Sequence, residues 1–399
     1  MSLTANEAYR DAVLRHQIQL RRYSSSVLKQ IATLLLRADQ DLSIQLRARL
    51  AKFPEGGRVD VTSERWKALL TDIRDARSAT IAEYKDLARG DLGDLSVDEA
   101  QREIGMLEAA IPIEVAFTRV AAPQLRAIAT KRPFQGHLLK DWFAGLERVD
   151  RARIQQALQL GMTQGETTDA IVKRIVGTKA NDFADGILSI TRRDAMSIAR
   201  TAINAVSNGA REEVWQANSD IIQCMIWHST LDGRTTPICR ARDGQGAPIG
   251  GNDLPDGVVA LQPATATPPA HMNCRSVMVA YIDGIGLVGK RPSVTDTRGR
   301  AQRETDFAAE AAANGTTVAE ERAAWADANI GRVPSATTYQ EWLTSQKASF
   351  QDDVLGPTRG QLFRQGGLRL DQFVDRAGAE LSLADLRGLY PSAFDAIGD

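Results

Sequence analysis

Cysteine is scarce in this chain, and so are the features that mark membrane and secreted proteins. The 399 residues include only three cysteines, an odd count that argues against a disulfide framework. No apolar run approaches the roughly 18–20 residues that a membrane helix needs, so we expect no contact with a membrane. The first residues lack the basic and apolar segments of a signal peptide, which predicts synthesis and function in a cytoplasm or in a particle assembled there.

Neither sign of charge is in excess, and common enzymatic motifs are missing. Lys plus Arg number 49 and Asp plus Glu number 50, for a formal net charge of −1. A protein that coats nucleic acid is usually basic overall, so a contact with DNA would depend on local basic pairs, such as Arg151 with Arg153 and Arg192 with Arg193. The chain has no HExxH, Walker A or GxGxxG pattern, and we expect that it is not an enzyme.

The first half of the chain is predicted to be helical. Apolar residues recur at helical spacing over 5–53, and a second helix is predicted from Thr62 to about Ala88. The segment Arg89–Asp94 is predicted to interrupt that helix, and Ser96 to cap the next one. With further helices over 138–160 and 166–175, the patterns predict two helical regions, 1–110 and 111–190.

The character of the sequence changes at about residue 187. Thr191 and Asp194 resemble a capping box, and the apolar stripe from Ala195 to Val214 predicts a long helix. Alternating apolar residues then predict a strand near 222–226, and the β-prone segment over 276–282 predicts a second one. The loop between them is too long to stand unsupported in a compact domain. Residues 191–288 are therefore predicted to be an α+β module with a long stapled loop, in a chain of α+β class.

Two segments follow this module. Residues 289–338 are polar and rich in Ala and Gly, which predicts a linker or an extended arm. Residues 339–399 mix aromatic residues with glycine turns, which predicts a small helical C-terminal tail. Such a division agrees with the length of the chain, because 399 residues favour two or three domains.

A group of Cys and His residues within the module indicates a metal site. Cys239, His271 and Cys274 offer the thiolate and imidazole ligands that zinc prefers. His271 and Cys274 have two residues between them, so a tight turn can aim both at one ion. Binding a metal there would tie the long loop shut. The fourth ligand stays open among His228, Asp232, Asp243 and water.

Two other interpretations apply to the same residues. The cysteines can be small buried hydrophobic side chains, which is what we expect of Cys224 in its alternating strand pattern. Alternatively, Cys239 or Cys274 can form a nucleophilic triad with His271 and an Asp. Neither cysteine lies in a strand-to-helix elbow, and no glycine loop suited to an oxyanion hole directly precedes either one. These absences argue against the triad.

The ordered motifs of the module also carry a family resemblance. They are Ile198-Ala-Arg-Thr201, Trp227, the segment Leu231–Cys239, Asp243-Gly244 and the segment Pro269–Arg275. Together they resemble the minor head protein F family of Mu-like phages, which is also described as the phage head morphogenesis domain. The similarity extends over residues 110–390 and is strongest over 195–282.

This resemblance implies a structural minor capsid protein of a tailed bacteriophage. Its partners would be the portal protein and the major capsid protein, and it would act in head assembly, DNA packaging or ejection. Its location would be the virion head, assembled in the host bacterial cytoplasm. Family members commonly carry Cys or His at the positions of Cys239, His271 and Cys274, which favours zinc. This chain has Thr236 and Ser276 where some members have further cysteines.

The resemblance also leaves an enzymatic alternative. The core of the family has been likened to the ADP-ribosyltransferase fold, which implies such a fold for the α+β module and an ADP-ribosyltransferase-like enzyme as the second hypothesis. We find no convincing active-site set of Arg, Ser-Thr-Ser and Glu in the sequence. The leading expectation is therefore an assembly protein with Cys239, His271, Cys274 and His228 as its zinc ligands.

Overall fold

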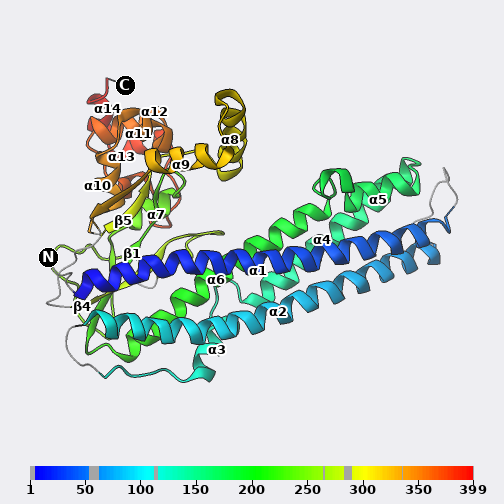
Figure 1. Cartoon of the computed structure of the whole chain (residues 1–399), viewed down its shortest axis with the longest axis horizontal. Coiled ribbons are helices and arrows are strands. Elements are labelled where there is room, and N and C mark those ends of the chain that lie inside the picture. The colour runs from blue at the N-terminus through cyan, green and yellow to red at the C-terminus, as the bar shows by residue number, and fades with distance from the viewer. Residues whose placement is uncertain are drawn as a thin grey trace.

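The computed structural model describes residues 5–53, 63–111, 116–263, 266–282, 290–334 and 336–398. Long helices make up the first half, and short helices and two small sheets follow (Figure 1). The chain is therefore α+β with a mainly helical N-terminal half, as the sequence predicted. None of the helices described combines the length and the apolar character needed to cross a membrane.

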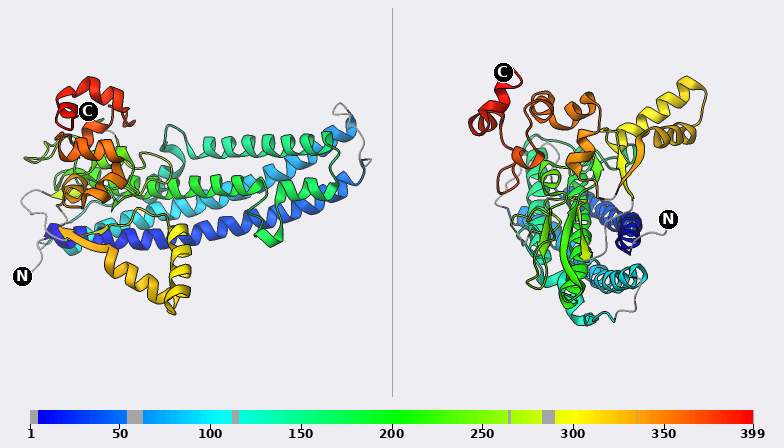
Figure 2. Two further views of the ribbon diagram at one scale, coloured as in Figure 1. Left: turned by 90° about the horizontal axis from the view of Figure 1, so that it is seen from above. Right: turned by 90° about the vertical axis from the view of Figure 1, so that its left-hand side faces the viewer.

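Four helices of the first half run side by side along the long axis and form a stalk (Figures 1 and 2). Their shared core includes Leu35, Ile81, Phe143 and Ala199, one from each helix. The stalk helices are α1 (Ala5–Leu50), α2 (Glu64–Ala110), α4 (Leu139–Thr163) and α6 (Leu188–Ala217), and the shorter α3 (Ala122–Lys131) and α5 (Thr168–Val176) pack against them.

Helix α2 runs without a break through the segment Arg89–Asp94, where the sequence predicted an interruption. Leu92 and Leu95 are buried in the stalk, and their burial outweighs the roughly 1 kcal/mol that each glycine costs within a helix. Ser96 is not a cap, because its hydroxyl lies inside α2 and donates to the carbonyl of Gly93. The prediction of a helix start there was wrong because tertiary packing overrides the local pattern.

The predicted capping box at the start of the next long helix is also wrong. Helix α6 begins at Leu188, so Thr191 and Asp194 both lie inside it. The Thr191 hydroxyl donates to the carboxylate of Asp150 on α4, and the Asp194 carboxylate pairs with Arg153, also on α4. Both side chains thus join two stalk helices instead of capping one.

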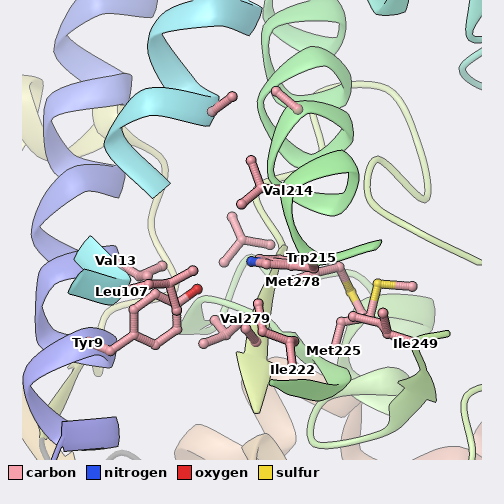
Figure 3. Packing of buried hydrophobic residues seen from close by; sticks show 14 of the residues in the cluster. Tyr9, Val13, Leu107, Val214, Trp215, Ile222, Met225, Ile249, Met278 and Val279 are labelled. Carbon is pink, nitrogen blue, oxygen red and sulfur yellow. The ribbon is translucent and has the colours of Figure 1, made fainter. Parts of the chain in front are cut away.

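A three-stranded antiparallel sheet lies at one end of the stalk, with strand order β3-β1-β4. These strands are β1 (Ile222–His228), β3 (Gly246–Pro248) and β4 (Val277–Ile282), so the two predicted strands are confirmed. Apolar side chains of β1 and β4 pack against α1, α2 and α6 around Tyr9, Leu107 and Trp215 (Figure 3). This core fixes the sheet, and with it both ends of the loop that carries the Cys and His residues, on the stalk.

A second three-stranded sheet has the order β2-β5-β6. Strand β2 (Leu231–Asp232) runs parallel to β5 (Lys290–Val294), and β6 (Ile330–Pro334) is antiparallel to β5. Between β5 and β6, helices α8 (Arg300–Asn314) and α9 (Val318–Asn329) form a hairpin that projects from the body (Figures 1 and 2). The sequence predicted a linker or extended arm over 289–338, and the described part of that segment consists of these strands and helices.

The C-terminal tail is a lobe of short helices, in agreement with its predicted helical character. Its apolar core includes Tyr339, Trp342 and Phe394, and Leu231 of β2 packs into the same cluster. The helices of the lobe are α10 (Tyr339–Thr344), α11 (Ala348–Leu355), α12 (Pro357–Arg364), α13 (Leu383–Leu389) and α14 (Pro391–Asp395).

Candidate metal centre

Cys239, His271 and Cys274 come together beside the first sheet. Cys239 lies on the short helix α7 (Pro237–Arg242), which begins with a proline at its first turn, and a proline is well suited to that position. His271 and Cys274 lie in the loop that leads into β4. The ligand atoms of the three residues all lie within 4.8 Å of one another. The fold therefore closes the long loop at the point that the sequence predicted.

The separations between these atoms suit a tetrahedral metal ion. The Sγ atoms of Cys239 and Cys274 are 3.7 Å apart, and Cys239 Sγ is 3.4 Å from His271 Nε2. Zinc bonds of about 2.3 Å to sulfur and about 2.0–2.1 Å to nitrogen, at the tetrahedral angle, place two sulfurs about 3.8 Å apart and a sulfur and a nitrogen about 3.6 Å apart. These two separations therefore match edges of a zinc tetrahedron, and the ligand atoms of Cys274 and His271 lie within 4.8 Å of each other.

The imidazole of His271 is oriented for metal binding. Its Nδ1 lies 2.9 Å from the carbonyl oxygen of Met272. A carbonyl can only accept, so Nδ1 carries the proton and the neutral ring presents the Nε2 lone pair to the cysteines. Metal-binding histidines commonly donate their other N–H to a backbone carbonyl in this way.

A hydrogen bond joins the thiols of Cys239 and Cys274. The hydrogen bond from Cys239, together with that of His271, lowers the pKa of the Cys274 thiol despite its burial. The same hydrogen bond to Cys274, together with burial, raises the pKa of Cys239. The hydrogen bond with Cys274 raises the pKa of His271. Cys274 is therefore the group that is readiest to bind a cation as a thiolate.

The part of the chain that contains the cluster is similar to a known family. Residues 152–279 match the family model of Phage Mu protein F like protein. The predicted resemblance is confirmed for these residues, which we call the Mu F-like region. No curated protein and no solved structure matches the chain.

The Mu F-like region extends from helix α4 into strand β4 and contains all three residues of the cluster. It also contains His228, which the sequence predicted as the fourth ligand. His228 is buried at the end of β1, where its backbone pairs with Val277. It is not among the residues whose ligand atoms lie within 4.8 Å of one another.

The two aspartates considered as fourth ligands have other partners. Both carboxylate oxygens of Asp232 accept hydrogen bonds from Arg275, at 2.5 and 2.8 Å. Burial alone would raise the pKa of Asp232, but the hydrogen bonds and charge of Arg275 outweigh it and hold that pKa below its usual value. Asp243 is paired in the same two-pronged way with Arg291. Sequence reasoning missed both arginine partners, because the paired residues lie 43 and 48 positions apart in the chain.

Two further predictions for the Mu F-like region can be compared with the structure. Cys224 is fully buried in β1, and burial raises its pKa to about 12, so it packs in the core as predicted. The Nδ1 of His271 contacts the backbone carbonyl of Met272, whereas the triad considered for these residues needs an Asp there. The geometry thus suits metal binding better than nucleophilic catalysis.

Proposed function

We propose that this chain is a structural minor head protein of a tailed bacteriophage. In this proposal it associates with the portal and major capsid proteins during head assembly in the host cytoplasm, remains in the virion head, and acts in assembly, DNA packaging or ejection. The observation that carries the proposal is the match of residues 152–279 to the Phage Mu protein F like family. The long stalk and the projecting α8–α9 hairpin offer extended surfaces of the kind that an assembly protein uses.

Isolation of head intermediates tests this proposal. We expect an antibody against the chain to detect it in proheads and to co-precipitate the portal protein from infected cells. A phage that lacks the gene should assemble defective heads, and supplying the full chain in trans should restore them. Absence of the chain from every head intermediate would overturn the proposal.

We also propose that Cys239, His271 and Cys274 hold a zinc ion. The support is the donor set, the spacing of the sulfur and nitrogen atoms, and the burial of both cysteines. The ion would supply a cross-link between α7 and the loop that precedes β4, and it would hold the 35-residue separation between the two cysteines closed. A structural role of this kind agrees with an assembly protein.

Metal analysis of the purified chain tests the zinc proposal. We expect about one zinc per chain in the wild type and none in Cys274→Ser, because two protein ligands hold zinc poorly. Cys224→Ser is the matched control, since this buried cysteine lies outside the cluster and its replacement should leave zinc in place. Wild-type protein without stoichiometric metal would end the proposal.

A contact with DNA is supported by one surface of the stalk. A hollow of about 360 Å³ between α2 and α4 is lined by Arg74, Arg148 and Arg151, and no carboxylate is among its lining residues. Within the described parts of the chain, Arg148 and Arg151 make no ion pair, whereas Arg153 and Arg192 are paired with aspartates. We propose that this hollow accepts phosphate groups of DNA.

Salt-dependent DNA binding tests that contact. Each phosphate contact contributes about 0.9 to the slope of log affinity against log salt. We therefore expect Arg148→Gln with Arg151→Gln to weaken binding and to reduce the slope by about 1.8. Arg322→Gln with Arg332→Gln removes the same charge elsewhere and should leave the slope unchanged. Equal effects of the two double variants would show that only net charge matters.

A further inference from the structure

The proposed metal centre has one imidazole and two thiol ligands, and a tetrahedral ion needs a fourth donor. Among the residues that the structure describes, the group of Cys, His, Asp and Glu side chains that can share one ion contains only Cys239, His271 and Cys274. The acidic candidates Asp232 and Asp243 are each engaged by an arginine. The fourth donor therefore has to be sought among weaker ligands.

Thr236 lies beside the position that a fourth donor would take. Its hydroxyl oxygen is 2.9 Å from His271 Nε2, and Cys239 Sγ is 3.4 Å from the same nitrogen. In a tetrahedral site every ligand atom is adjacent to the other three, so the fourth donor must contact both nitrogen and sulfur. At oxygen and nitrogen bond lengths of about 2.0–2.1 Å, a fourth oxygen donor would lie about 3.3 Å from Nε2. The Thr236 oxygen is closer to Nε2, at 2.9 Å, so its hydroxyl lies next to that position.

Ser276 is the other hydroxyl near the cluster, but it lies on the buried side of the cluster. Its oxygen lies 3.3 Å from the hydroxyl of Ser229, which donates to the carbonyl of Cys239. Ser276 is buried, as are both cysteines. Thr236 and His271 are half-buried instead, so the vertex beside Thr236 is the one that solvent can reach.

We propose that Thr236 marks an open fourth coordination position, which an exchangeable oxygen donor fills and which can accept small external donors such as imidazole or cyanide. The proposal rests on the metal centre proposed above. Structural zinc sites usually have four protein ligands, whereas sites with an exchangeable ligand have three protein ligands. The Thr236 hydroxyl would orient the external donor as a neighbour of Cys239 and His271.

Cobalt substitution tests the open position without requiring any enzymatic activity. The full chain is loaded with Co²⁺ in place of zinc, and its visible spectrum is recorded while imidazole or cyanide is added. An open position predicts a saturable spectral shift with retention of the metal. Failure to bind Co²⁺ or Zn²⁺ at all would refute the metal centre itself. A bound cobalt ion whose spectrum does not change on addition of imidazole or cyanide would refute only the open position.

Variants of the two hydroxyl residues then locate the position. Thr236→Cys should add a thiolate, raise the sulfur-to-cobalt charge-transfer absorbance, abolish the response to imidazole and tighten metal binding. Thr236 makes no side-chain cap to α7, so its replacement removes no helix cap. Ser276→Cys is the matched comparison, and a gain of charge-transfer absorbance there but not in Thr236→Cys would overturn the assignment.

His228 supplies the remaining check. His228→Gln should leave the cobalt spectrum and its response to imidazole unchanged if the position is open. Loss of the tetrahedral cobalt spectrum in this variant would show that His228 is a fourth protein ligand, and the proposal would then be wrong. Thr236→Val, which keeps the shape but removes the hydroxyl, should weaken the response to external donors while retaining the metal.

Discussion

The carboxylate of Asp243 and the guanidinium of Arg291 form a buried ion pair, with two nitrogen–oxygen separations of 3.0 Å. The exposed fractions of the two side chains are 1% and 4%. Asp243 also accepts from the backbone N–H of Tyr339, and Arg291 donates to the carbonyl of Thr337. The pair thus fastens the Mu F-like region to strand β5 and to the start of the C-terminal lobe.

Removal of one partner from this pair should be strongly destabilising. Arg291→Gln leaves a buried carboxylate without its cation, which typically costs about 3–5 kcal/mol. We expect a matching loss in the free energy of unfolding by urea. Lys67→Gln removes one partner of an exposed ion pair and should cost less than about 1 kcal/mol. Equal midpoints for Arg291→Gln and the wild type would contradict the role given to Arg291.

A second buried network should make stalk stability depend on pH. Arg77 donates to Asp39 and to Asp150, so it joins three stalk helices. Burial raises the pKa of Asp39, although the charge of Arg77 opposes this effect. A raised folded-state pKa means that the contribution of this group is fully present below the unfolded pKa and is lost as pH rises through the folded pKa.

Arg77→Met should enlarge that dependence, because it removes one of the two cations that oppose the rise and leaves only Arg192 beside Asp39. We expect a loss of about 3–5 kcal/mol near neutral pH, which becomes smaller as pH falls and Asp39 is protonated. Urea unfolding of the variant and the wild type at several pH values measures this. A deficit that is constant with pH, or that grows on acidification, would show that the carboxylates do not cause it.

Chelation should loosen the loop between the two cysteines. Removal of zinc from the wild type should lower the melting temperature and speed amide hydrogen exchange over residues 240–275, because the cross-link is lost. Cys274→Ser should already have these properties and should not respond to the chelator. A chelator effect of equal size in Cys274→Ser would place the responsible metal elsewhere.

The contact between the C-terminal lobe and α7 should be sensitive to one glycine. A Cβ at Gly378 would lie 2.2 Å from Ile238, next to Cys239, and its φ is +85°. Gly378→Ala should therefore cost more than backbone strain alone, by about 1–3 kcal/mol for the clash. Gly257→Ala is the control, because Gly257 has φ of +82° and open space around its Cβ position. Similar unfolding free energies for the two variants would argue against close packing at Ile238.

Much of the candidate centre could be predicted because the residue types themselves indicate metal ligands. Cys239, His271 and Cys274 are soft or borderline ligands in one loop-rich segment, and their order matches the Mu F-like motifs. The family resemblance pointed to Thr236 and Ser276, but the contacts of their hydroxyls and the pairing of Arg275 with Asp232 could not be predicted, because such polar residues are common in loops of any kind. Their roles depend on distances that only the closed loop creates.

By itself, the sequence determined the periodic elements and the ligand types of this protein. Local burial patterns underlie the helical spacing of the first half, the alternation near 222–226 and the β-prone segment over 276–282, and the structure forms helices and strands there. Tertiary structure alone decided that α2 continues through Arg89–Asp94, that Thr191 joins two helices, and that Asp243 pairs with Arg291. Each of these outcomes depends on a partner far away in the chain, and the energy of such a long-range contact has no signature in the local sequence.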